Sequence, residues 1–420
     1  MDSLPQSEQA QESRQHYEEP DTATTGITAS LPESAPAAPK PQWADWAIRA
    51  ALWAVTVGIF AGRLGGDLSN SAVLLPLLIV AALMAFYLLA SVAPVMNRIY
   101  AWAQAEPVAM SAMPLIMLAP YIFYGQLYGT FEASNLLMSG VLLYMPVALS
   151  VINTRRLRVA DALLGLIVVA MPLVLPLTNY QIGAVLTTGD ALLRVGAFVL
   201  PLLLLLLSTR EQKANLHFLF VCSVLSLWYS IEFNAFPGFD LPGQPAGLAY
   251  FHLAAIAAFL YILAVSGRFG GLGLSFSLSP RSLSIVASNL AIFALIAIPL
   301  GLLTHFIIPG VAPTSIPDAL ARAFTIYIAV ALPEEILFRG TLLHYLDDTF
   351  RWPQAQTIVI SALIFGAAHL DNPPNIGWYF VLAAIAGIFY ARVYVATKNV
   401  SASATLHTAV NWIWALVFAG

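Results

Sequence analysis

The stretch IAVALPEEILFRGTLL, residues 328–343, places Glu334, Glu335 and Arg339 inside a hydrophobic run. A charged side chain surrounded by lipid costs several kcal/mol unless it is paired or solvated. Residues four apart share a helix face, so we expect Glu335 and Arg339 to form an ion pair. Glu334 points about 100° away on the same helix, which makes it the candidate for chemistry. Pro333 is expected to kink this helix.

The composition indicates an integral membrane protein. The chain has 420 residues, of which 59% are hydrophobic and only 10% are charged, whereas soluble domains carry about 25% charged residues. The net charge of -4 argues against a nucleic-acid partner. The single cysteine, Cys222, excludes a disulfide framework or a thiolate metal site within the chain.

The hydrophobic pattern predicts an all-α, polytopic membrane protein, because a spanning helix needs about 20 mostly apolar residues. We expect about 13 transmembrane helices. They are predicted near residues 43–62, 71–93, 107–126, 136–152, 159–177, 191–208, 214–233, 246–266, 284–304, 318–346, 354–370, 376–396 and 401–419. Lys and Arg concentrate in alternate loops, which predicts a cytoplasmic amino terminus in a multi-pass cell-membrane protein that contacts membrane lipids.

Changes in composition divide the chain into three parts. Residues 1–42 are polar and rich in Pro, Ser and Ala, which predicts a disordered cytoplasmic tail. The Gly- and Ser-rich stretch at 266–282 marks a boundary. It separates an amino-terminal membrane domain of about eight spans, residues 43–267, from a helical bundle of about five spans, residues 283–420.

Two further polar pairs lie in the carboxyl-terminal domain. In SALIFGAAHLDN, residues 361–372, Phe365 and His369 are four residues apart, and in ATLHTAVNWIW, residues 404–414, the same spacing joins His407 and Asn411. A carboxylate can activate water as a general base, while imidazole and carboxamide groups can hold that water, bind a metal or stabilise an oxyanion. This combination of groups suits hydrolysis of a peptide bond.

The segments EEILFR, FGAAH and HTAVN resemble the Glu-Glu-x-x-x-Arg, Phe-x-x-x-His and His-x-x-x-Asn motifs of one protease family. This is the family of CAAX-processing and bacteriocin-processing intramembrane proteases, also called the type II CAAX prenyl protease or abortive-infection family. The three motifs occur in the order and with the spacing of the family. The resemblance covers the last third of the chain, roughly residues 282–420.

The resemblance implies an intramembrane endopeptidase that cleaves a membrane-associated or prenylated peptide or protein. Glu334 would be the general base and His369 would help hold the water or a metal. His407 and Asn411 would form the oxyanion side, with Glu335 and Arg339 shaping the site. The resemblance is compatible with two mechanisms. One is that of a zinc enzyme with Glu334, His369 and His407 as ligands, and the other is that of a metal-free glutamate protease.

Other interpretations of the same residues remain open. The polar groups can instead join helices in a proteolytically inactive scaffold or bacteriocin-immunity-type protein, or form the ion site of a transporter, although the sequence shows no internal repeat. Straight helices would place Glu334 and His369 about 18–22 Å from the cytoplasmic edge and His407 about 9 Å from it. A kink at Pro333, helix tilt or a His407 helix that starts deeper would bring them together.

Overall fold

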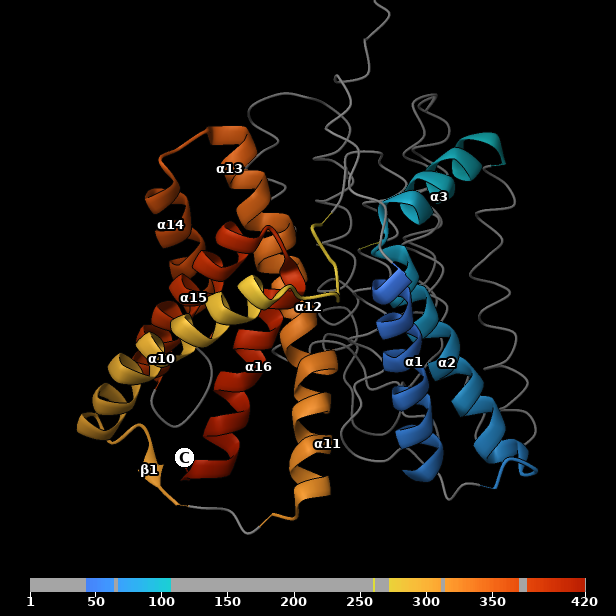
Figure 1. Cartoon of the computed structure of the whole chain (residues 1–420), viewed down its shortest axis with the longest axis horizontal. Helices are drawn as coiled ribbons and strands as arrows, with labels where there is room; N and C mark the ends of the chain where they lie inside the picture. The colour runs from blue at the N-terminus through green and yellow to red at the C-terminus, as the bar shows by residue number, and fades with distance from the viewer. Residues whose placement is uncertain are drawn as a thin grey trace, which may run out of the picture. The chain divides into compact units, whose positions relative to one another are not determined.

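The computed structural model describes residues 43–63, 67–106, 260, 272–310, 314–369 and 376–419, and these are almost entirely helical (Figure 1). The predicted helical fold is thus confirmed for this part of the chain. The predicted tail at 1–42 and six predicted spans, apart from residue 260, lie outside the described residues, so the total of about 13 spans stays a prediction. Those spans are 107–126, 136–152, 159–177, 191–208, 214–233 and 246–266.

The predicted spans that lie within the described residues all correspond to helices. Near the amino end these are α1 (Trp43–Arg63) and α2 (Ser71–Ala90), and α2 is followed by α3 (Ala93–Ala105). Near the carboxyl end they include α10 (Pro280–Leu303), α14 (Gln354–Ala367), α15 (Ile376–Thr397) and α16 (Val400–Val417). Two short strands, β1 (Ile308–Pro309) and β2 (Phe418–Ala419), pair antiparallel beside these helices, an element that the sequence did not predict.

Several described helices have the length and composition needed to cross a membrane. Trp43–Gly62, Pro280–Leu303 and Gly377–Thr397 meet this criterion, each with at most two charged residues in its apolar window. The end of α2 and the start of α3 form a further apolar pair, bent by 105°. Together with the composition, these helices identify a membrane protein.

The segment that carries Glu334 is a helix with two widened turns. It runs through α11 (Ile316–Ile326), η1 (Tyr327–Ala331), α12 (Leu332–Glu335), η2 (Ile336–Leu343) and α13 (His344–Phe350) as one continuous path (Figure 1). The η segments are π-helical. Such turns are rare and often occur at functional sites. Pro333, which lacks a backbone N–H, is the second residue of α12, between the two π-helical segments.

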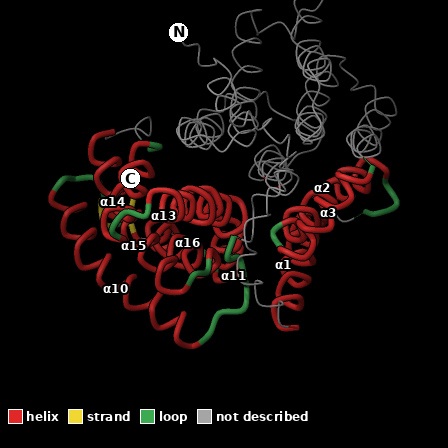
Figure 2. Tube along the Cα trace, turned by 90° about the horizontal axis from the view of Figure 1, so that it is seen from above, coloured by secondary structure: helices red, strands yellow, loops and turns green. Residues whose placement is uncertain are grey.

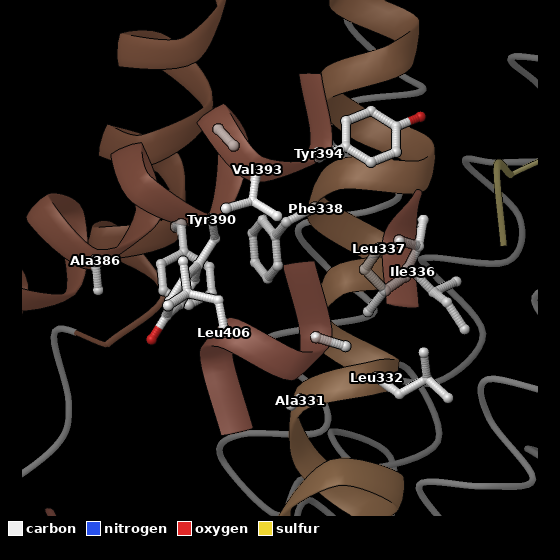
Figure 3. Packing of buried hydrophobic residues seen from close by; sticks show 14 of the residues in the cluster. Ala331, Leu332, Ile336, Leu337, Phe338, Ala386, Tyr390, Val393, Tyr394 and Leu406 are labelled. Atoms are coloured by element: carbon white, nitrogen blue, oxygen red, sulfur yellow. The ribbon is translucent and has the colours of Figure 1, made fainter. Parts of the chain in front are cut away.

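Apolar side chains of this path form the centre of the carboxyl-terminal core. Phe338 is fully buried and is directed toward Tyr390 and Val393 of α15 (Figure 3). Ile336 and Leu337, in the same turn, are also completely buried. Burying a large apolar side chain stabilises the fold by about 1.5–3 kcal/mol. The charged residues of the segment are therefore surrounded by tightly packed hydrophobic groups.

Helices α14 and α15 lie side by side (Figures 1 and 2) because small residues let their backbones approach closely. A Cβ atom added at Gly366 would lie 2.8 Å from the carbonyl oxygen of Phe380 and 2.8 Å from the Cβ of Ala384. Only a hydrogen fits in that space. This contact fixes the end of α14, directly before His369.

The amino terminus of α16 is buried, and its backbone groups are satisfied by specific partners. The Asn399 side chain accepts a hydrogen bond from Ser401 N at 2.9 Å, and Val400 N donates to the carbonyl oxygen of Gly273 at 2.9 Å. Gly273 has φ +65°, and a Cβ there would lie 2.4 Å from the Lys398 carbonyl oxygen. These contacts let α16 begin inside the protein, which positions His407 two turns later.

Candidate active site

Glu335 is the centre of a buried hydrogen-bond network. Its Oε1 accepts hydrogen bonds from Arg339 Nη1 at 3.0 Å and from His407 Nδ1 at 3.0 Å, while Oε2 accepts one from Ser403 Oγ at 2.6 Å. Glu335, Arg339 and Ser403 each have 0% exposed surface. The ion pair predicted from the spacing of Glu335 and Arg339 is therefore present, and it extends to a second helix.

Arg339 is held by more than its carboxylate partner. Its Nη2 donates to the Gly387 carbonyl oxygen at 3.1 Å, and its guanidinium carbon lies 4.3 Å from the centre of the Phe365 ring. A guanidinium over an aromatic face is stabilised by the ring quadrupole. Phe365, the first residue of the Phe-x-x-x-His motif, thus packs against Arg339, the last residue of the Glu-Glu-x-x-x-Arg motif.

Glu334 and His407 face each other across the site. Glu334 Oε2 lies 3.8 Å from His407 Nε2, and both residues are nearly buried, with 4% and 3% of their surfaces exposed. Because a carboxylate only accepts hydrogen bonds, His407 donates through Nδ1–H to Glu335 and presents its Nε2 edge toward Glu334. Two adjacent glutamates therefore contact opposite edges of one imidazole.

His369 has its ring fixed in a similar way. Its Nδ1 lies 2.9 Å from the Phe365 carbonyl oxygen, and its ring stacks on Tyr379 with centroids 5.5 Å apart and an interplanar angle of 21°. A carbonyl oxygen accepts, so Nδ1 carries the hydrogen and Nε2 has the lone pair. Nε2 can then accept a hydrogen bond from water.

One cavity brings all four predicted catalytic residues together. It has a volume of about 350 Å³, within the usual range for ligand sites, and Glu334, His369, His407 and Asn411 all line it. Its remaining walls are mainly apolar side chains from α10, α15 and α16, including Phe293, Leu382 and Trp414. A small polar group at one side of an apolar cavity is a typical arrangement for a binding or catalytic site.

Glu334 and His407 lie 3.8 Å apart in the structure, although straight helices would place them at different depths. Residues of its first two turns, including Val400, Ala404 and His407, are buried, whereas the turns after His407 are half-exposed. The capped start of α16 therefore lies inside the bundle.

Two residues of the site were missed by reasoning from the sequence. Ser403 donates to Glu335, and Tyr390 stacks on the His407 ring with centroids 4.5 Å apart and an interplanar angle of 17°. Ser403 lies four residues before His407, so extending the spacing of His407 and Asn411 backwards would have found it. Tyr390 lies on α15, outside the motifs, and no local pattern identifies it.

A metal ion needs ligands that are grouped closely around one point. Catalytic zinc sites have three protein ligands, and the fixed Nδ1 atoms of His369 and His407 are typical of such ligands. Across the described stretches of the chain, however, no three His, Cys, Asp or Glu side chains are grouped closely enough to hold a metal. The described residues therefore do not fit a zinc ion held by Glu334, His369 and His407, and zinc stays a prediction from the family.

Comparison with known proteins agrees with the motifs. Residues 316–413 match the family model described as type II CAAX prenyl endopeptidase Rce1-like. A curated protein of Escherichia coli, described as an uncharacterized 24.3 kDa protein, is 40% identical over 58 residues, which are 14% of this chain and 27% of that protein. The alignment thus spans about a quarter of that relative. No solved structure matches the chain.

The matched region, residues 316–413, contains all four predicted catalytic residues, from Glu334 to Asn411. It includes each of the three polar pairs, and the structure places those pairs around one cavity. The carboxyl-terminal region of this membrane protein is therefore similar to the Rce1-like type II CAAX prenyl endopeptidases, which confirms the resemblance that the motifs predict.

Proposed function

We propose that this protein is an intramembrane endopeptidase in which Glu334 activates the attacking water. The observation that carries this proposal is the shared cavity, where a nearly buried carboxylate faces an imidazole at 3.8 Å and a carboxamide lies in the same lining. General base, water-positioning group and oxyanion donors are the groups that peptide hydrolysis requires. The family match supports a protease in general.

In the proposed reaction, Glu334 takes one proton from water, and the hydroxide oxygen attacks the carbonyl carbon of the scissile peptide bond. The electrons of the C=O double bond move to the carbonyl oxygen. The Asn411 amide donates a hydrogen bond to this oxyanion, and His407, in the same cavity lining, completes the oxyanion side. Glu334 then transfers its proton to the amide nitrogen while the C–N bond breaks. His369 holds the water through its Nε2 atom, and no step passes through a metal.

The cavity also supports a proposal about the substrate. Its walls are mainly apolar, and it lies among helices of a membrane protein. A peptide that enters from the lipid with uncharged side chains beside the scissile bond loses little solvation energy there, whereas a charged side chain would be costly. We therefore propose a membrane-associated or prenylated peptide or protein as the substrate.

The proposal is tested with the full chain purified in detergent and two fluorescence-quenched peptides, one farnesylated and one without the lipid. The wild-type protein is expected to cleave the farnesylated peptide, and Glu334→Gln is expected to lose cleavage while keeping its thermal unfolding temperature. Glu106→Gln, which changes an exposed glutamate at the end of α3, is the matched control and should cleave normally. Equal cleavage by wild type and Glu334→Gln would end the assignment of Glu334 as the base.

The alternative of an inactive scaffold is favoured by one observation: Glu335, Arg339 and Ser403 form a fully buried network that joins two helices. Such a network can stabilise helix packing without catalysis. The scaffold hypothesis predicts no cleavage of either peptide by wild-type protein. It also predicts that Glu334→Gln leaves the cellular function unchanged.

A further inference from the structure

We propose that Ser403 is a positioning residue for His407, acting through Glu335; its consequence for cleavage rests on the proposed function above. The Ser403 hydroxyl donates to Glu335 Oε2 at 2.6 Å and lies 2.9 Å from the Tyr390 carbonyl oxygen. Its side chain is fully buried and is not part of the cavity lining. Ser403 therefore lies outside the cavity, on the far side of Glu335, and does not act as a nucleophile on a substrate in the cavity.

The position of Ser403 matters because one oxygen of Glu335 accepts two hydrogen bonds. Oε1 accepts hydrogen bonds from both Arg339 and His407, each at 3.0 Å. The last torsion of a glutamate side chain is soft, so hydrogen bonds to one oxygen alone leave the carboxylate some freedom to turn about that bond. The hydrogen bond from Ser403 to Oε2 holds the other oxygen. This contact fixes the plane of the carboxylate and hence the direction in which Oε1 accepts from His407.

Other contacts of His407 do not provide this orientation. Tyr390 stacks on the imidazole with an interplanar angle of 17°, which restricts the ring plane but does not distinguish the two ring orientations related by a 180° flip about Cβ–Cγ. The hydrogen bond to Glu335 selects one of these orientations and keeps Nδ1–H toward Glu335 and Nε2 toward Glu334. Ser403, Glu335 and His407 therefore form a chain of contacts that ends at the cavity.

The local structure of α16 keeps this chain of contacts in register. Ser403 and His407 are four residues apart, so they lie on the same face of the helix, toward the segment that carries Glu335. The start of the helix is fixed by the Asn399 cap and by the bond from Val400 to Gly273. A shift of α16 by one residue would turn Ser403 and His407 away from Glu335 together.

The direct test observes His407 in the full chain without any substrate. Protein labelled with ¹⁵N-histidine and purified in detergent is compared by NMR as wild type, Ser403→Ala and Thr405→Val, with the His407 signals assigned from His407→Gln. In wild type the Nδ1–H proton should resonate far downfield because it is bonded to a carboxylate. Ser403→Ala should shift this signal upfield and broaden it. Thr405→Val, which removes a hydroxyl that donates to the Ser401 carbonyl oxygen on the same helix, should leave it unchanged.

Cleavage kinetics give a second and separate result. With the farnesylated peptide, Ser403→Ala should lower kcat about 10- to 100-fold, as for other groups that orient a functional histidine, while KM stays near the wild-type value. An unchanged Nδ1–H signal in Ser403→Ala, or an equal change in Thr405→Val, would overturn the positioning role. If wild-type protein cleaves nothing, the proposed function fails, but the NMR comparison still decides the role of Ser403.

Discussion

At the scale of single residues, the site depends on two adjacent glutamates with different surroundings. Glu335 is fully buried and accepts hydrogen bonds from Arg339, His407 and Ser403. Glu334 lies at the cavity, 3.8 Å from His407 Nε2. One carboxylate is thus fixed by the protein, and its neighbour lines the space that a substrate would enter. Helix geometry gives them these separate directions, as the sequence predicts.

Removing metal ions tests the metal-free form of the mechanism at this scale. Because the described residues do not group three suitable ligands, cleavage of the farnesylated peptide is expected to persist after incubation with 1,10-phenanthroline or EDTA. Elemental analysis of the same purified sample should find less than one zinc ion per chain. Loss of cleavage with chelator, together with its return on adding zinc, would contradict this expectation and support a zinc enzyme.

At the scale of elements, close packing of α14 against α15 positions His369. Gly366 allows the backbones to meet, because a Cβ at that position would lie 2.8 Å from the Phe380 carbonyl oxygen. Helix α14 ends at Ala367, and His369 N donates to the Gly366 carbonyl oxygen at 2.9 Å just beyond it. The close contact of α14 with α15 at Gly366 therefore helps to fix the position of His369.

Gly366→Ala is expected to lower the free energy of unfolding by about 1–3 kcal/mol, the usual cost of overpacking a tight contact. Thermal unfolding of the full chain in detergent, followed by circular dichroism, measures this loss. Gly377→Ala on α15 is the matched control, since a Cβ there meets nothing within 4 Å. Alanine also favours helix more than glycine does, so the control should be neutral or slightly stabilising. Equal unfolding temperatures for the two variants would contradict the close approach.

Several features of these elements were predictable from sequence, and others were not. Spacing of four residues predicted the bond from Arg339 to Glu335, because it depends only on local helix geometry. The π-helical turns on either side of α12 have no such local signal, since they depend on how the segment packs. The contact between His407 and Glu334 depends on where α16 begins within the bundle. Contacts of Asn399 and Gly273, which lie outside the motifs, hold that start in place.

At the scale of the whole molecule, α1 is bonded to the segment that leads into the site-bearing helices. Arg49 Nε lies 2.6 Å from Asp45 Oδ2, and Arg49 Nη2 donates to the Leu274 carbonyl oxygen at 3.0 Å. Asp45 also accepts a hydrogen bond from the backbone N–H of Phe276. The neighbouring Ser275 N donates to the side chain of Asn399, which caps α16, at 3.2 Å. A polar path therefore connects the first described helix with the helix that carries His407.

Replacing Arg49 tests this connection. Arg49→Met leaves Asp45 buried without its cation and is expected to lower the free energy of unfolding by about 3–5 kcal/mol. Arg98→Met, at an exposed arginine of α3, is the control and should change it by about 0.5 kcal/mol or less. Unfolding of the full chain in detergent measures both. Similar stability of the two variants would show that the Asp45–Arg49 pair contributes little to holding α1 in place.

The most direct test of convergence at one catalytic cavity is a double-mutant cycle for peptide cleavage. It compares kcat/KM for wild type, Glu334→Asp, His407→Ala and the double variant, with Glu334→Asp combined with Thr405→Val as the uncoupled reference. Residues that act together give non-additive losses. We predict that kcat/KM of the double variant falls by much less than the product of the two single fold-losses. For the reference pair, the two fold-losses in kcat/KM should multiply. Losses that multiply for Glu334 and His407 as well would contradict a shared site.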